Sequence, residues 1–544
     1  MGVRRINKLK NEPMTYFGRH LVALGISLFL VSLARAQFGS DTTSFDSTAY
    51  RYAQTIRVDE LREHLSVLAA DSLEGRETGQ PGQKKAAEYL ANYYQSLSLS
   101  PPVDDSSYLQ TFPIIESSWD QPFVAIDGKR FTLFEDFYAF PAMAEPLDTL
   151  IDEVTFMGYG IAGERYDDYQ QAKVRGRTIL ILSGEPVGRD STYLLSGTDQ
   201  PSRFTTNFRA GLQAKYDMAK ERGVRVVLVV DENYQENIQR FALYAARPSM
   251  RLQSETVAQT SLIFISPEMA QALVGEKRLA KARQRIVKRG KPYSFRRATH
   301  LTFALRQDVD RMTSENVLAY LEGSDLKDEL LVITSHYDHI GITEGQVNNG
   351  ADDDGSGTVG VLELAEAFAQ AKVDGHGPRR SILFMNVSGE EKGLFGSEYY
   401  TDHPVFPLDS TIADLNIDMI GRIDPAHAQD SAYVYVIGSD RLSTELHQIN
   451  ETSNARYTKL DLDYTYNAPD DPNRFYYRSD HYNFAKHGVP IIFYFNGTHA
   501  DYHKPTDTIE KINFPLLRDR TRLVFYTAWQ LVNQDQRIEV NATE

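Results

Sequence analysis

The segment LLVITSHYD at residues 330–338 decides the fold prediction, because an apolar run there ends directly in a histidine and an aspartate. Leu330–Ser335 is short and rich in apolar and β-branched residues, which is typical of a buried strand. From Asn316 onward, similar runs alternate with amphipathic stretches; the other strand candidates are Ser381–Val387, Ile412–Ile417, Ala432–Ile437 and Pro490–Phe495. This alternation predicts an α/β domain whose largely parallel sheet is covered by helices.

Helical periodicity supplies the other layer of that domain. Apolar residues recur on one face at Thr358–Ala371, at Leu516–Val532 and within residues 57–99, the last interrupted by a turn at Gly75–Gly82. We therefore expect helices at both ends of the chain to cover the sheet.

A second, smaller α/β unit is expected between residues 150 and 232. Its strand candidates, Thr178–Leu182 and Val224–Val230, are separated by a helical stretch at Gln213–Arg222. The basic stretch Lys277–Arg297 that follows is interpreted as a solvated helix face and a loop.

Acidic residues and histidines gather where the predicted strands end. Ligand sites in open sheets of this type form beyond the carboxyl ends of the strands, so these residues are expected to meet at one edge. Each signal is weak alone, since a lone histidine or an acidic pair is usually an ordinary surface or core feature. Their convergence predicts a site in five segments, at residues 336–338, 350–357, 388–391, 418 and 496–503.

The segments around these residues resemble the co-catalytic di-zinc aminopeptidase family, whose relatives include glutamate carboxypeptidase, glutaminyl cyclase and the transferrin receptor. The resemblance covers residues 316–515 in detail, with a further match near Leu61–Leu90. It rests on the segments HYDH, GADDDGSG, SGEEKGLFGSEYY, NIDMIGR and DYHKPTDT. It implies the zinc-exopeptidase fold, a mostly parallel, helix-covered mixed sheet.

The same resemblance implies two zinc ions and a set of ligands. Asp353 would bridge the ions, with His336 and Asp418 completing one site and Glu391 and His503 the other. The peptide bond that follows Asp353 is expected to be cis. Three carboxylates and a bridging hydroxide would balance the four positive charges, so the site can be buried. Two neutral imidazoles favour zinc over magnesium or calcium.

Three further residues have expected roles beside the metal. Glu390 falls on the position of the general base, and a turn at Gly389 would let the adjacent glutamates point apart. Asp338 is a candidate for fixing the ring of His336. Tyr502 is a candidate for donating a hydrogen bond to the oxyanion, with plain packing as an equal alternative.

The smaller unit resembles a protease-associated domain through Phe156–Ile161, Val174–Arg177 and the stretch from Lys215 to Gly223. In relatives, such a domain borders or covers the active-site cleft. The expected organisation is a signal peptide at 1–36, a first part of the peptidase domain at 37–144, an inserted protease-associated domain at 145–300 and the remainder of the peptidase domain, with the metal site, at 301–544.

The N-terminus predicts export to the periplasm or the medium. Basic residues up to Arg19 precede an apolar run at Leu21–Leu33, and a small-x-small cleavage site ends at Ala36. The run has about a dozen residues, whereas a membrane span takes about twenty, so cleavage before Gln37 is favoured over a membrane anchor. The chain has no cysteine, which excludes disulfides and zinc–thiolate sites.

The expected function is that of a zinc-dependent aminopeptidase that releases N-terminal residues from peptides. A formal net charge of −16 disfavours nucleic acid and anionic membranes as partners. A carboxypeptidase or dipeptidase is the alternative on the same scaffold, with Arg474 and Arg478 as candidates for holding a substrate carboxylate. A non-catalytic binding protein like the transferrin receptor is disfavoured because all five ligands and the base are present. A glutaminyl cyclase is disfavoured because those relatives use one zinc.

Overall fold

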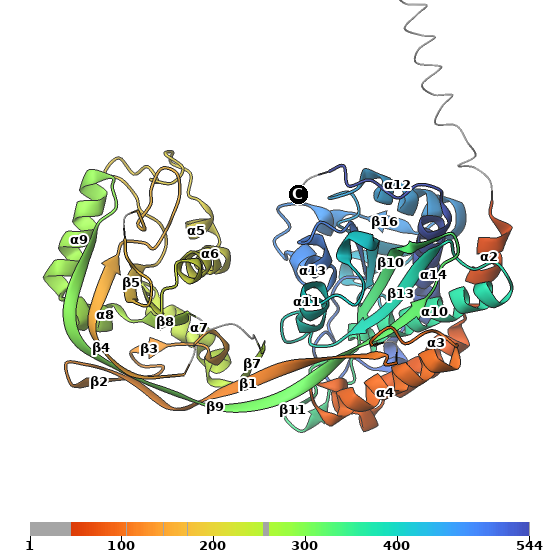
Figure 1. Cartoon of the computed structure of the whole chain (residues 1–544), viewed down its shortest axis with the longest axis horizontal. Coiled ribbons are helices and arrows are strands. Elements are labelled where there is room, and N and C mark those ends of the chain that lie inside the picture. The colour runs from red at the N-terminus through yellow and green to blue at the C-terminus, as the bar shows by residue number, and fades with distance from the viewer. Residues whose placement is uncertain (1–44, 105, 145, 171, 254–259, 543–544) are drawn as a thin grey trace, which may run out of the picture.

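The computed structural model describes residues 45–542, except residues 105, 145, 171 and 254–259. The predicted signal peptide at 1–36 and the predicted mature N-terminus at Gln37 lie outside the described residues. Figure 1 shows two lobes that are joined by a long ribbon of two strands. Among the described helices, none has the combination of length and hydropathy that crossing a bilayer requires.

The larger lobe is built on a mixed sheet that is mostly parallel, as predicted. Strand β10 lies at its centre and pairs in parallel with β13 and β14, and β14 pairs in parallel with β17. β9 and β15 join in antiparallel orientation. From edge to edge the order is β16 (Asp461–Asp463), β15 (Tyr433–Ile437), β17 (Ile491–Phe495), β14 (Thr411–Ile417), β10 (Leu326–His336), β13 (Arg380–Val387) and β9 (Ser294–Leu321).

Helices cover both faces of this sheet because successive side chains of each strand point to opposite sides. Leu331 and Ile333 of β10 pack into a core with the helices of one face, and Leu330 and Val332 pack into the core of the other. The first face carries α2 (Ser47–Ala53), α3 (Val58–Leu68), α4 (Pro81–Ser96), α10 (Gly357–Val373), α12 (Thr444–Ser453) and α14 (Phe514–Asn533). The second carries α11 (Phe395–Asp402) and α13 (His481–Ala485).

The smaller lobe contains three parallel strand pairs, β4–β5, β5–β6 and β6–β8. It therefore has the α/β character that the sequence predicts. Its elements are β2 (Lys129–Thr132), β3 (Phe137–Tyr138), β4 (Leu147–Met157), β5 (Thr178–Leu182), α5 (Arg203–Thr206), α6 (Phe208–Glu221), β6 (Val226–Val230), α7 (Tyr234–Ala246), β8 (Ser261–Ile265), α8 (Pro267–Val274) and α9 (Glu276–Arg289). Its core includes Val124 and Phe137, so it begins before the expected boundary at residue 145.

The ribbon that joins the lobes was not expected from the sequence. It consists of β1 (Leu109–Ile126) and β9, paired in antiparallel register from Leu109 opposite Val317 to Ile126 opposite Leu301. Short strands β7 (Ser249–Leu252) and β2 pair along β1. Because β9 runs without interruption through residue 300, the expected boundary there lies inside a strand that belongs to both lobes.

Candidate metal centre

The candidate site forms at the carboxyl ends of the parallel strands of the larger lobe. β10 ends at His336, and β14 ends one residue before Asp418. β13 ends at Val387, after which Gly389 adopts a φ of +81° and turns the chain. The positive φ is accessible to glycine at little steric cost, and it lets the next two glutamates face different parts of the site.

Asp353 lies in the tight turn that precedes α10. Its own backbone N–H and that of Asp352 both donate to Oδ2 of Asp507, at 3.2 and 2.9 Å. The peptide bond between Asp353 and Asp354 is cis, which confirms the prediction. The Asp354 carboxylate accepts hydrogen bonds from the backbone N–H groups of Gly357 and Met419, both at 2.8 Å. These bonds link the start of α10 to the end of β14.

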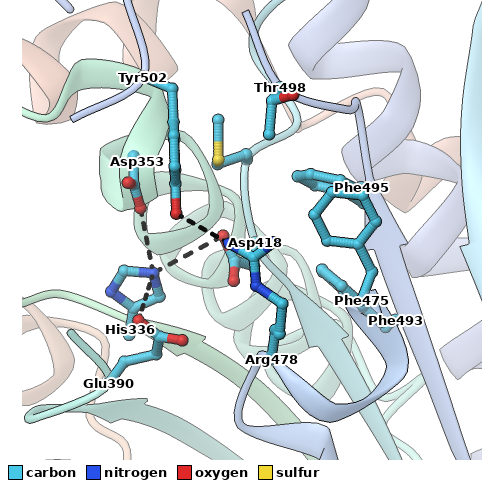
Figure 2. Close-up of a pocket in the computed structure, with 11 residues that line it drawn as sticks. His336, Asp353, Glu390, Asp418, Phe475, Arg478, Phe493, Phe495, Thr498 and Tyr502 are labelled. Carbon is cyan, nitrogen blue, oxygen red and sulfur yellow. Dashed lines mark hydrogen bonds and ion pairs between the residues drawn. The ribbon is translucent and has the colours of Figure 1, made fainter. Parts of the chain in front are cut away.

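One group of predicted ligands surrounds Nε2 of His336. This nitrogen lies 3.4 Å from Oδ1 of Asp353 and 3.6 Å from Oδ1 of Asp418, and Oε2 of Glu390 lies 3.9 Å away (Figure 2). Such separations suit atoms that share one metal ion at bond lengths of about 2 Å. Ser479 donates its hydroxyl to the other oxygen of Asp418 at 2.7 Å, which fixes that carboxylate.

The second group shares the Asp353 carboxylate. Nε2 of His503 lies 3.1 Å from Oδ2 of Asp353 and 3.1 Å from Oε2 of Glu391. His339, which was not predicted as a site residue, lies on the other side of Glu391, with Nδ1 at 2.8 Å from Oε1. Its signal in the sequence was only its position in HYDH, one residue after Asp338, where a strand has already ended.

The electrostatics of these two groups fit divalent cations. Oδ2 of Asp353 and Oε1 of Glu391 are buried without a hydrogen-bond partner in the described part of the chain. Burial and the nearby carboxylates raise the pKa of Glu390 well above its usual value. Burial lowers the pKa of His503, but the Asp353 and Glu391 carboxylates beside it outweigh that effect and bring the pKa to about 10. Two nitrogen donors among several closely spaced carboxylates form a donor set that suits zinc.

Asp338 contacts His336 through its backbone more closely than through its side chain. Nδ1 of His336 lies 3.1 Å from the carbonyl oxygen of Asp338 and 3.8 Å from its carboxylate. The carboxylate instead accepts hydrogen bonds from the Thr78 hydroxyl at 2.6 Å and from the backbone N–H of Glu390 at 3.3 Å. Asp338 therefore holds both the ring of His336 and the turn that carries the predicted base.

Tyr502 lies over the site, with its ring stacked on that of His503 at 3.9 Å between centroids. Arg478 donates to its hydroxyl at 3.5 Å (Figure 2). Burial, together with Asp353, Glu391 and Glu390, raises the pKa of Tyr502, so the phenol keeps its proton and can donate.

A small hollow opens beside these residues. One wall carries the site side chains, and the other is apolar, formed by Phe475, Phe493 and Phe495 (Figure 2). Arg478 also lines it. The hollow therefore offers an apolar surface and one guanidinium to whatever binds at the candidate metal centre.

A second cleft lies between the two lobes. The smaller lobe contributes Arg203, Thr206 and Asn207, at the junction of α5 and α6. The larger lobe contributes Arg441, Tyr466, residues 468–472, Arg474, Tyr476 and Tyr477. The cleft adjoins the hollow, because residues 474–478 form a turn whose members line one or the other.

Comparisons with known proteins agree with this geometry. Residues 316–528 match the model of Peptidase family M28. Aminopeptidase YwaD of Bacillus subtilis is 25% identical over 233 residues, which make up 41% of this chain and 46% of that protein. Leupeptin-inactivating enzyme 1 of Streptomyces exfoliatus is 29% identical over 242 residues, 40% of this chain and 49% of that protein. The chain thus spans about half the length of these curated relatives.

Among solved structures, the chain is similar to an aminopeptidase from Aneurinibacillus sp. strain AM-1. The two chains are 17% identical, with a TM-score of 0.49 over 91% of this chain and 98% of the other. A zinc aminopeptidase from Bacillus subtilis, BSAP, is 18% identical, with a TM-score of 0.44 over 90% of this chain and 98% of that one.

Proposed function

Residues 316–528 of this chain belong to peptidase family M28, and from this premise we propose that the protein is a zinc-dependent aminopeptidase that holds two zinc ions. The observation that carries the proposal is the meeting of two histidines and four carboxylates, from four strand ends and the turn before α10, at one edge of the sheet. The relatives named as aminopeptidases support the choice of reaction.

The proposed ligands divide into two sets that share Asp353. His336 and Asp418 would hold one zinc ion with it, and Glu391 and His503 would hold the other. Oδ2 of Asp353, which is buried without a hydrogen-bond partner among the described residues, supports this assignment. When bound, zinc lowers the pKa of water towards neutrality and polarises the peptide carbonyl.

The chain's own groups then have defined tasks. Glu390, whose carboxylate lies 3.9 Å from Nε2 of His336 and lines the hollow, accepts a proton from the attacking water and passes it to the leaving amine. The Tyr502 hydroxyl donates a hydrogen bond to the carbonyl oxygen as negative charge develops there. The apolar wall around Phe475 and Phe495 receives an apolar side chain of the substrate and excludes water from it.

Arg478 keeps a second activity open on the same scaffold. Its guanidinium lines the hollow and could hold a free substrate carboxylate, as a dipeptidase or carboxypeptidase requires. Arg474, the other candidate for that role, lines the interlobe cleft instead and stacks over Tyr477 at 4.6 Å. The relatives that are named as aminopeptidases favour an aminopeptidase over this second activity.

A substrate panel tests the proposed activity. Amino-acid anilides carry a free amine and no carboxylate, whereas N-blocked dipeptides carry a free carboxylate and no amine. We expect cleavage of leucine or phenylalanine anilide, loss of that activity with a chelator and recovery with added zinc. Cleavage of the blocked dipeptides alone would make the protein a carboxypeptidase. Full activity with fewer than two zinc ions per chain would contradict the metal assignment.

Export and the inserted domain complete the proposal. The basic and apolar N-terminal segment supports cleavage after Ala36, which intact-mass measurement of protein from its native host would test.

We also propose that the smaller lobe is a protease-associated domain that borders the approach to the site. The cleft that both lobes line supports this role.

A further inference from the structure

His339 is fully buried beside the second group of site residues. Its Nδ1 lies 2.8 Å from Oε1 of Glu391 and 3.8 Å from Oδ2 of Asp353. Neither ring nitrogen has a hydrogen-bond partner of good geometry among the described residues, and the contact with Glu391 is the closer of these two. Leaving a buried polar group unpaired costs about 1–3 kcal/mol, so Glu391 is the partner that this ring nitrogen needs.

The backbone around His339 holds the ring in place. The His339 N–H donates to the carbonyl oxygen of Arg76 at 3.2 Å, and the Arg76 guanidinium donates to the carbonyl oxygen of Gly350 at 3.0 Å. A Cβ atom at Gly350 would lie 2.6 Å from Cγ and Cδ2 of the ring. The ring therefore packs against the backbone of Gly350, which lies in the turn that leads to Asp353.

Glu391 divides its two oxygens between different neighbours. Oε1 faces His339, and Oε2 faces Nε2 of His503 at 3.1 Å. Asp418 shows the same division, because one of its oxygens accepts the Ser479 hydroxyl and the other faces His336. In both carboxylates, one oxygen is held by a protein group while the other is presented to the site.

We propose that His339 is a positioning residue for the second metal ion. It donates its Nδ1–H to Oε1 of Glu391, so that only Oε2 is offered to the ion beside His503. The inference rests on the proposed two-zinc function. Partners that orient a metal ligand in this way typically change metal affinity by about 10–100-fold when they are removed.

Zinc retention by the full chain tests the proposal without relying on activity. The zinc-loaded protein is dialysed against increasing concentrations of a competing chelator, and zinc per chain is measured by elemental analysis. His339→Leu removes the donor, whereas His339→Asn places an amide N–H near the position of Nδ1. His64→Leu is the matched control, since His64 is also buried but bonds to Tyr89 at 2.7 Å, away from the metal centre.

We expect His339→Leu to lose one of its two ions at a chelator concentration about 10–100-fold below that which strips the wild type. His339→Asn should recover most of the difference, and His64→Leu should keep both ions at the wild-type concentration. If His339→Leu keeps both ions as the wild type does, the inference is wrong. If the asparagine variant is as weak as the leucine variant, the ring ligates the ion directly and the positioning role is overturned. A wild type that holds fewer than two ions would overturn the proposed function itself.

Discussion

Glu390 and Glu391 are neighbours in the chain but serve different parts of the proposed mechanism. Glu390 faces the hollow beside His336, and Glu391 lies between His339 and His503. We expect Glu390→Gln to keep both zinc ions while kcat falls by about 10²–10⁴, because the amide cannot accept the proton from water. Glu391→Gln should lose zinc and thermal stability together, because it weakens a metal ligand.

The measurement for this pair is kcat alongside zinc content and melting temperature, made on the same preparations. Asp402→Asn is a suitable control, since Asp402 ends α11 on the surface and takes no part in the site. A Glu390→Gln variant that retains most of the wild-type kcat would show that this glutamate is not the base, whatever the zinc content.

At the scale of residues, the sequence predicts those site residues that lie at strand ends or within the motifs of the resemblance. The structure brings His336, Asp353, Glu390, Glu391, Asp418 and His503 together at one sheet edge. The sequence could not predict the roles of His339 and Ser479, because each role depends on which oxygen of a carboxylate the side chain contacts. That depends on side-chain rotamers and on the path of the turn at Gly350, for which the local sequence carries no periodic signal.

Glu363 of α10 provides a prediction at the scale of elements. Its side chain is 2% exposed, and Oε1 has no hydrogen-bond partner among the described residues. Burial, together with Glu60 and Glu366, raises its pKa from 4.5 to about 8. The folded protein therefore holds this proton more tightly than the unfolded chain does. The stability that results is fully present below about pH 4.5 and is lost as the pH rises through about 8.

Glu363→Gln should remove this loss of stability at rising pH, because the amide stays neutral at every pH. A pKa shift of this size corresponds to a few kcal/mol, at about 1.4 kcal/mol per unit. We expect the variant to gain about 2–4 kcal/mol relative to the wild type between pH 6 and pH 9 in urea unfolding. Glu366→Gln, one turn further along α10, removes one of the two carboxylates that help to raise this pKa, so it should weaken the pH dependence only in part. Equal pH dependence in all three proteins would contradict the protonated Glu363.

Elements of regular period were predicted well, and those of irregular burial were not. The strand and helix candidates at 330–335, 358–371 and 516–532 lie within β10, α10 and α14. β1 and β9 were missed because their burial alternates only in part along 18 and 28 residues, where both strands cross from one lobe to the other. The basic stretch at 277–297 was interpreted as a helix face and a loop, but after α9 it enters β9 at Ser294.

The interlobe cleft provides a prediction for the whole molecule. If long peptides leave the hollow through it, a bulky side chain there should hinder them and spare short substrates. Thr206→Trp, at the end of α5, is expected to lower kcat/KM by about 3–10-fold for peptides of six or more residues, chiefly through KM, and to leave anilide cleavage unchanged. Lys288→Trp is the control, because α9 lies on the side of the lobe away from the site (Figure 1). An equal effect on both substrates would contradict this path.

The ribbon of β1 and β9 also dictates the order in which the nascent chain can fold. Leu109 cannot pair until its partner Val317 has been synthesised, roughly two hundred residues later. The smaller lobe, in contrast, has nearly all of its core residues once Leu305 has been synthesised. The apolar faces of α3 and α4 are synthesised first, yet they are buried against β10, α10 and α14. At about 5–20 residues per second, these helices stay uncovered for on the order of tens of seconds. The middle of the molecule therefore folds before its beginning, and the first helices are the segment that a chaperone has the longest time to bind.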